Sequence, residues 1–190
     1  MDKIDKIFES TDRKLFLPEE QSGFSDSDRP LPIGFAQTNS QPSTVKMMLE
    51  WLEVEPGCKI LDVGSGSGWT AALLSKLTGP TGKVYAVEII PELVEFGRRN
   101  AVEAGIKNVR FFKAGKQFGL ARYAPYDRIL VSATTDELPK VLLAQLKVGG
   151  KMVIPVHRDI LEITKYDKGA YETFIHPGFL FVPLVDPAKA

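Results

Sequence analysis

One short stretch of the sequence constrains the fold more than any other. The apolar residues 59–63 are followed by Gly64, Gly66 and Gly68, three glycines at alternate positions. An apolar run bounded by turn residues is typical of a strand buried in a parallel sheet. The glycines predict a tight turn whose backbone approaches another group closely, and residues 70–77 predict a helix after it. Strand, glycine turn and helix together indicate a nucleotide-type site facing the N-terminus of the helix.

Composition and charge indicate a globular protein that does not depend on a nucleic acid or a membrane. The 190 residues are 44% hydrophobic, and 24 basic residues balance 24 acidic ones. This length suffices for one full core, and zero formal net charge favours neither a nucleic acid nor a membrane as partner. No apolar stretch is long enough to span a bilayer.

The compartment and the oligomeric state follow from weaker signals. Cys58 is the only cysteine, so no intrachain disulfide can form, which favours a reducing compartment. The charged N-terminus lacks the apolar segment of a signal peptide. No apolar repeat indicates a partner helix. We therefore expect a cytoplasmic monomer.

The rest of the chain predicts an α/β fold. We expect a doubly wound, mainly parallel, Rossmann-like sheet with helices on both faces and a C-terminal antiparallel hairpin, because strand and helix patterns alternate along most of the chain. The expected strands are 59–63, 83–88, 109–112, 126–131 and 151–155. The expected helices are 2–8, 43–52, 68–77, 91–104 and 138–146. Residues 161–166 and 171–175 predict the hairpin, and 179–182 is expected to continue it to the sheet edge.

We expect a single domain over residues 1–190, with an N-terminal arm and lid over residues 1–42 and a core over residues 43–190. The polar stretch 11–37 contains enough large apolar residues to favour an ordered arm over a disordered tail. Ser40 is expected to cap the helix that begins near Pro42.

The residues around the glycine turn favour one class of nucleotide ligand. Gly64, Gly66 and Gly68 are spaced one residue short of the dinucleotide fingerprint, and no Gly-Lys-Ser/Thr follows them as a phosphate-binding loop requires. Glu88 ends the next strand, where a carboxylate can accept hydrogen bonds from a ribose. Asp62 brings negative charge to the turn, which suits an ammonium or a sulfonium better than a phosphate. This pattern favours S-adenosylmethionine over NAD or ATP. A purely structural turn and a solvated strand end are the alternatives for the loop and for Glu88.

With these motifs in place, the sequence resembles the protein-L-isoaspartate (D-aspartate) O-methyltransferase family of S-adenosylmethionine-dependent class I methyltransferases. The resemblance covers nearly the whole chain. Its most specific parts are Thr38-Asn39-Ser40-Gln41-Pro42 and Ala124-Pro125-Tyr126-Asp127. The glycine turn with Asp62, the segment 84–93 and Phe181-Val182-Pro183-Leu184 match as well.

The resemblance implies methyl transfer from S-adenosylmethionine to the free carboxylate of isoaspartyl or D-aspartyl residues in damaged proteins. The resulting methyl ester collapses to a succinimide, which allows repair. Because a carboxylate is ionised at pH 7, such a site needs positioning and exclusion of water rather than a strong base. Ser40 matches the family's serine at the methyl-transfer site and is the implied catalytic residue. The implied cofactor-binding residues are Thr38, Asp62, Gly64, Ser65, Gly66, Gly68, Glu88, Ile89, Gly115 and Lys116.

Four places depart from the family's usual pattern. Ala114-Gly115-Lys116 replaces Gly-Asp-Gly at the adenine, and Asn39 replaces an isoleucine before the catalytic serine. His157 and Val185 stand where small residues are common. His157 is either a surface residue or a side chain that fills space beside the acceptor. Two alternatives therefore stay open: a methyltransferase with another acceptor, and an interaction module with weak or no catalysis. No Cys/His cluster indicates a metal site.

Overall fold

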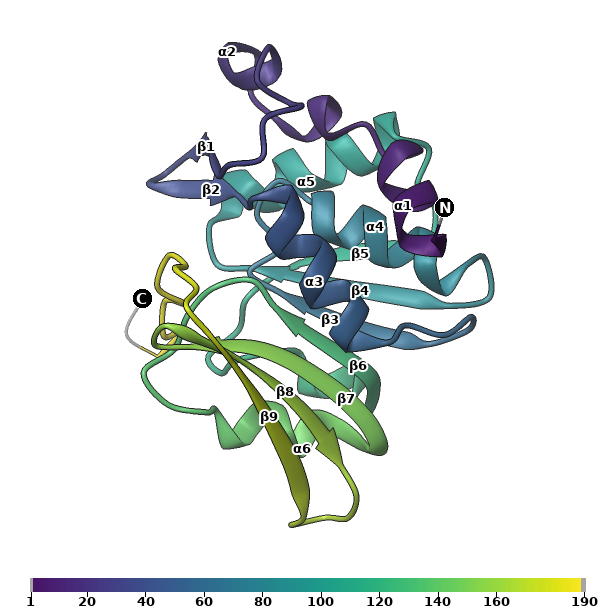
Figure 1. The fold of residues 1–190 in the computed structure, drawn as a ribbon, viewed down its shortest axis with the longest axis vertical. Helices are drawn as coiled ribbons and strands as arrows, with labels where there is room; N and C mark the ends of the chain where they lie inside the picture. The colour runs from purple at the N-terminus through teal and green to yellow at the C-terminus, as the bar shows by residue number, and fades with distance from the viewer. Residues whose placement is uncertain (1, 189–190) are drawn as a thin grey trace.

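The computed structural model describes residues 2–188, and seven of its strands form one sheet in the order β5-β4-β3-β6-β7-β8-β9 (Figure 1). The strands of this sheet are β3 Lys59–Val63, β4 Lys83–Glu88, β5 Val109–Lys113, β6 Tyr126–Val131, β7 Leu146–Val156, β8 Asp159–Lys165 and β9 Tyr171–Pro177. Strands β3 to β7 run parallel, whereas β8 and β9 continue the sheet as an antiparallel meander. A separate two-stranded sheet pairs β1 Leu31–Gly34 with β2 Gln37–Asn39.

Helices cover both faces of the large sheet, but unequally. The helices are α1 Lys3–Glu9, η1 Arg13–Phe16, α2 Glu19–Ser22, α3 Pro42–Leu52, α4 Trp69–Thr78, α5 Pro91–Glu103, η2 Ala121–Tyr123 and α6 Lys140–Gln145. Apolar residues of α1, α3, α4 and α5 pack on one face. The opposite face is covered by the short α6, by η2 and by the loop 114–124. The predicted doubly wound α/β fold with its C-terminal hairpin is confirmed.

The central strand β3 shows how the sequence pattern places the site. Neighbours β4 and β6 flank it, so both of its faces are buried. Ile60 packs toward α4, while Leu61 and Val63 pack on the opposite face. Because side chains alternate along a strand, Asp62 lies on the same side as Ile60, next to α4. A carboxylate is thereby buried directly under the glycine turn.

The beginning of α3 differs from the prediction. The residue preceding the helix is Gln41, and the Ser40 side chain does not cap it. Instead the Oδ1 atom of Asp28, from the arm (residues 1–42), accepts a hydrogen bond from Ser43 N at 2.8 Å, and its Oδ2 atom accepts one from Gln41 Nε2 at 3.0 Å. These bonds hold the pKa of Asp28 below its usual range. The arm therefore caps α3 from a distance, which no local pattern could reveal.

The end of the chain also differs from the prediction. Residues 179–182 do not extend the hairpin to the sheet edge, because Pro177 and Gly178 end β9 and Gly178 adopts a φ of +96°. Gly178 N and Phe179 N donate to Arg158 O, which turns the chain back across the sheet. Residues 182–184 then lie beside the loop after β6, seen as the yellow segment in Figure 1.

The predicted bounds of β7 and α6 also differ from those in the structure. Strand β7 begins at residue 146 rather than 151, and α6 is correspondingly shorter than predicted. The register between β6 and β7 shifts, since Tyr126 pairs with Leu146 but Arg128 pairs with Lys151. Gly149 and Gly150 therefore lie in a bulged part of the strand rather than in a turn before it.

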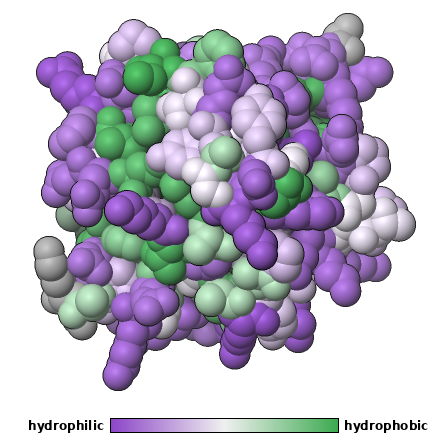
Figure 2. All heavy atoms as spheres, turned by 90° about the horizontal axis from the view of Figure 1, so that it is seen from below, coloured by the Kyte–Doolittle hydropathy of each residue, from purple (hydrophilic) through white to green (hydrophobic). Residues whose placement is uncertain are grey.

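The surface at the lower end of the molecule mixes hydrophilic and hydrophobic residues (Figure 2). The large hydrophobic side chains exposed on the hairpin and its turn are Tyr166, Tyr171, Phe174 and Ile175. Within residues 2–188, no helix is both long and apolar enough to cross a membrane.

The turn between β7 and β8 gives a stability prediction. His157 is exposed and has a φ of +53°, a left-handed conformation that costs an L-residue about 1–2 kcal/mol. We expect His157→Gly to raise the free energy of unfolding by about 0.5–1 kcal/mol, measured by urea denaturation, because relief of this strain exceeds the added chain entropy. Arg158→Gly, in the same turn but without a positive φ, should lower it by a similar amount. Equal losses in both variants would show that residue 157 is unstrained.

Candidate active site

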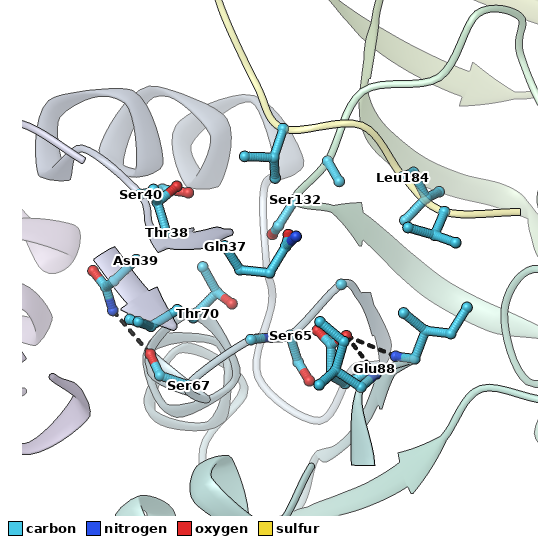
Figure 3. Close-up of a pocket in the computed structure, with 18 of the residues that line it drawn as sticks. Gln37, Thr38, Asn39, Ser40, Ser65, Ser67, Thr70, Glu88, Ser132 and Leu184 are labelled. Atoms are coloured by element: carbon cyan, nitrogen blue, oxygen red, sulfur yellow. Dashed lines mark hydrogen bonds between the residues drawn. The ribbon is translucent and has the colours of Figure 1, made fainter. Parts of the chain in front are cut away.

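A cavity lies at the carboxyl ends of β3, β4 and β6, where the arm and the C-terminal segment 182–185 meet the sheet (Figure 3). The space is about 640 Å³ including its open mouth. Its walls contain Ile33, Gln37, Thr38, Asn39, Ser40, Gly64, Ser65, Gly66, Ser67, Trp69, Thr70, Glu88, Ile89, Ile90, Ser132, Ala133, Val182, Pro183, Leu184 and Val185. Seven of the sequence-predicted site residues are among them: Thr38, Ser40, Gly64, Ser65, Gly66, Glu88 and Ile89.

The glycine turn is held in place by its neighbour strand. Gly64 N and Ser65 N both donate to Val87 O of β4, at 2.9 and 3.1 Å. Gly66 has a φ of +50°, and a Cβ on it would lie 3.1 Å from Ile33 of the arm. A side chain at this position would therefore be strained and would press against the arm, so the turn approaches its surroundings as closely as the sequence predicts.

The carboxylate of Glu88 is fixed at the edge of the cavity rather than solvated. Its Oε2 atom accepts a hydrogen bond from Gly66 N at 2.9 Å. Its Oε1 atom accepts from Ile89 N at 2.7 Å and from Ile90 N at 3.1 Å. With 6% of its surface exposed, Glu88 is not a solvated strand end. A carboxylate has about four lone-pair sites, so one remains for a hydroxyl group in the cavity.

Asp62 lies beneath the cavity and does not line it, which changes its expected role. The residue is fully buried, its Oδ2 atom accepts a hydrogen bond from Thr70 Oγ1 at 2.8 Å, and its Oδ1 atom has no partner among the described residues. Burial raises its pKa from 3.8 to about 7, the Thr70 hydroxyl opposes this rise, and the neighbouring Glu88 adds to it. Thr70 does line the cavity, so Asp62 is connected to the site through the Thr70 hydroxyl.

Gly68 has a packing role. Its φ is +88°, and a Cβ there would come within 3.1 Å of the Gly97 backbone and of Phe111. Since Gly68 immediately precedes α4, this contact lets α4 and α5 approach each other. Gly68 does not line the cavity, although the sequence placed it with the cofactor-binding residues.

The expected adenine segment is also only partly at the site. Gly115 and Lys116 are exposed and line neither the cavity nor the apolar recess that adjoins it. That recess is walled by Ala114 and Phe118 and, from the C-terminal segment, by Leu184 and Val185. Sequence reasoning missed Phe118 and Leu184 as site residues, although Leu184 belongs to a matched motif. His157 lies on the surface and lines neither the cavity nor the recess, which favours the surface-residue alternative.

Ser40 lies on the arm side of the cavity, across from Ser65 and Glu88 (Figure 3). Its hydroxyl makes no hydrogen bond to any residue within 2–188. A second, open groove borders the cavity here, and Thr38, Ser40, Ser132 and Val182 belong to the walls of both. Ser40 is therefore placed where the two spaces meet, with its hydroxyl available to a ligand.

The residues fit a polar, cationic ligand. The Ser65 hydroxyl and Asp62 Oδ1 are buried and unpartnered within the described part of the chain. Such atoms are rare in native proteins and indicate a missing hydrogen-bond partner. A cation in the cavity would favour the ionised form of Asp62.

The buried Asp62 predicts an inverted pH dependence. The folded protein holds this proton up to about pH 7, whereas the unfolded chain releases it near pH 4. Stability should therefore fall as the pH rises from 5 to about 7.5, and Asp62→Asn should remove on the order of 3 kcal/mol of that fall. Urea titrations at each pH measure it. Thr70→Val, which removes the bond that lowers this pKa, should extend the fall to higher pH. Parallel pH profiles for wild type and Asp62→Asn would refute the assignment.

Comparison with known proteins identifies relatives of this chain. The model of the Protein-L-isoaspartate(D-aspartate) O-methyltransferase (PCMT) family matches residues 1–189. The protein-L-isoaspartate O-methyltransferase of Pyrococcus horikoshii is 41% identical over 189 residues, covering 97% of this chain and 85% of the relative. The enzyme of that name from Methanothrix thermoacetophila is 46% identical over 176 residues, covering 91% and 83%.

A solved structure of a protein-L-isoaspartate O-methyltransferase superposes with a TM-score of 0.88 at 28% identity. It covers 96% of this chain, and the chain spans 61% of that structure's length. The match of the family model over nearly the whole chain, together with these relatives, shows that the chain belongs to the protein-L-isoaspartate (D-aspartate) O-methyltransferase family.

Proposed function

We propose that this protein transfers the methyl group of S-adenosylmethionine to the free carboxylate of isoaspartyl or D-aspartyl residues in damaged proteins. The observation that carries the proposal is the position of Ser40, in the wall shared by the cavity and the groove. A methyl donor in the cavity and an acceptor in the groove would meet at this residue. Family membership supplies the identity of the acceptor.

Different residues around the cavity can bind the different parts of the cofactor. Glu88 would accept a hydrogen bond from the ribose, and the backbone of residues 64–66 borders the same space. The recess beside Phe118 and Leu184 offers an apolar surface to the adenine. On the side of Thr70, an ammonium group in the cavity would favour the ionised form of the buried Asp62, whose negative charge would then stabilise it. When bound, S-adenosylmethionine supplies an electrophilic methyl group on its sulfonium.

The chain itself then has two tasks, orientation and exclusion of water. The Ser40 hydroxyl can donate a hydrogen bond to the acceptor carboxylate, which is already ionised at neutral pH and needs no base. The N-terminus of α3 is not available for this carboxylate, because Asp28 occupies it. Residues 180–182 form one wall of the groove and shield the point where the two spaces meet.

The open groove is suited to a peptide. Leu180, which is 77% exposed, and the exposed Pro30 stand on its walls, so a polypeptide chain can enter from the surface. We also propose that residues 1–42 serve as the lid of a single domain, and that the protein acts as a cytoplasmic monomer without a nucleic-acid or membrane partner. The balanced charge and the lone, buried Cys58 support this setting.

The central test is methyl transfer from S-adenosylmethionine to an isoaspartyl peptide, with the matching aspartyl peptide as control. Ser40→Ala should lower kcat about tenfold or more, because a donor to the reacting carboxylate is lost. It should leave the Kd for S-adenosylhomocysteine unchanged in calorimetry. Ser43→Ala, close by but outside cavity and groove, serves as the matched control. A wild-type protein that binds S-adenosylhomocysteine but methylates neither peptide would mean that the acceptor is wrong.

Glu88→Gln should weaken S-adenosylhomocysteine binding by about 1–3 kcal/mol, or roughly 10- to 100-fold in Kd. The substitution removes the negative charge that faces the ribose. The NH₂ group of the new amide would also face a backbone N–H that now donates a hydrogen bond to the carboxylate, and two donors cannot bond to each other. Glu95→Gln, on the exposed face of α5, is the control for a general loss of negative charge. Unchanged affinity in Glu88→Gln would remove Glu88 from the cofactor site.

A further inference from the structure

Asn39 is a buried polar residue that the proposed mechanism does not use. It ends β2, lies directly before Ser40 and is only 5% exposed. Its Oδ1 atom accepts a hydrogen bond from Arg13 Nε at 2.8 Å, and its Nδ2 atom donates one to Ser67 Oγ at 3.1 Å. Figure 3 shows the second bond spanning from the arm to the glycine turn. Both functional atoms of the side chain are thus used, each toward a different part of the molecule.

Arg13 connects several segments of the arm to Asn39 through hydrogen bonds. Its guanidinium is buried and donates to Asn39 O at 3.2 Å and to Ser40 O at 2.9 Å. It also donates to the carbonyl oxygens of three residues farther along the arm, Ser25, Ser27 and Arg29. Burial lowers its pKa to about 10, so it stays charged at neutral pH. The guanidinium lies 5.3 Å from the centre of the Trp69 ring, at the start of α4. Arg13 therefore holds both carbonyls of the 39–40 segment from one side.

Ser67 anchors the other end of this network. It lies in the glycine turn, is 2% exposed, and its carbonyl oxygen accepts a hydrogen bond from Asn100 Nδ2 of α5 at 3.0 Å. The hydrogen bonds thus run from the arm through Asn39 to the turn and on to α5. They connect the segment that carries Ser40 to the segment that borders the cofactor cavity.

We propose that Asn39 is a positioning residue that fixes the Ser40 hydroxyl relative to the glycine turn. The proposal rests on the proposed function, since it assigns Ser40 its orientation for the same reaction. Without the Asn39 amide, Arg13 Nε and Ser67 Oγ lose their buried partners, and leaving buried polar groups unpaired is costly. The 38–40 segment would move to satisfy them, and small misplacements of a reacting group reduce rates steeply.

Two substitutions at residue 39 separate positioning from packing. Asn39→Leu keeps the approximate shape and removes both bonds, whereas Asn39→Asp keeps an acceptor for Arg13 and lets the Ser67 hydroxyl donate to the second oxygen. We expect Asn39→Leu to lower kcat for the isoaspartyl peptide by about tenfold or more. Because Asn39 also lines the cavity, we expect its Kd for S-adenosylhomocysteine to rise by a smaller factor than the one by which kcat falls. Asn39→Asp should keep kcat within a factor of about three of wild type.

Ser67→Ala and a distant control sharpen the test. Ser67→Ala cuts only the link to the turn, so it should lower kcat in wild type but not further in Asn39→Leu, a non-additivity expected of a shared network. Asn108→Leu removes a comparable side chain, bonded to the carbonyl oxygens of Ser75, Gly79 and Gly82 far from the site. It should lower the melting temperature and leave kcat per folded molecule unchanged.

Amide hydrogen exchange over residues 37–41 measures how firmly the same network holds this segment, and it does not require catalysis. Asn39→Leu should exchange faster than wild type, and Asn39→Asp should not. If wild type methylates no isoaspartyl peptide, the proposed function fails, while this measurement still decides the positioning. The inference is overturned if Asn39→Leu and Ser67→Ala lose stability but keep kcat and exchange rates, or if Asn39→Asp is as impaired as Asn39→Leu. Should Asn39→Leu not fold, the comparison of Ser67→Ala with Asn39→Asp decides by the same readouts.

Discussion

The attachment of the glycine turn to strand β4 is the constraint on which the rest of the site depends. The backbone N–H groups of Gly64 and Ser65 both donate hydrogen bonds to the carbonyl oxygen of Val87. The side chain of the next residue, Glu88, accepts a third hydrogen bond, from the N–H of Gly66. One strand end thus shapes the turn through its backbone and presents a carboxylate beside it. At the end of the turn, Gly68 has a positive φ and no side chain, which lets the start of α4 approach Gly97 of α5.

A second constraint comes from the arm, which provides half of the site. A buried guanidinium is costly unless its donors are satisfied, and Arg13 meets this requirement with backbone carbonyls and the Asn39 side-chain oxygen rather than with a carboxylate. Between Ser27 and Arg29, whose carbonyl oxygens bind Arg13, lies Asp28, whose carboxylate caps α3. Since Asp28 takes the capping role, the Ser40 hydroxyl has no hydrogen-bond partner among residues 2–188 and stands at the boundary between cavity and groove. The arm therefore does more than cover the site, because its hydrogen bonds orient one wall of it.

Local patterns predicted the sheet accurately where both faces of a strand are buried. The bounds of β3, β4 and β6 match their predicted ranges, since continuous apolar runs between turn residues have few other interpretations. The pattern failed at Gly149 and Gly150, where a bulge in β7 resembles a turn, and at residues 179–182, where an apolar run resembles an edge strand. In both places the outcome depends on which distant backbone groups are available for pairing, which the local sequence does not contain.

The sequence by itself determined the α/β fold, the glycine turn between a buried strand and a helix, the carboxylate at the end of β4, and membership of the family that these motifs resemble. Tertiary structure alone decided which of the marked residues reach the cavity. Asp62 lies beneath it because side chains alternate along β3, and Gly68 lies against Gly97 because two helices must approach there. Phe118 and Leu184 come together from segments more than sixty residues apart. Spacing along a chain specifies the direction of each strand and turn, whereas contacts between distant segments follow from how the whole core packs.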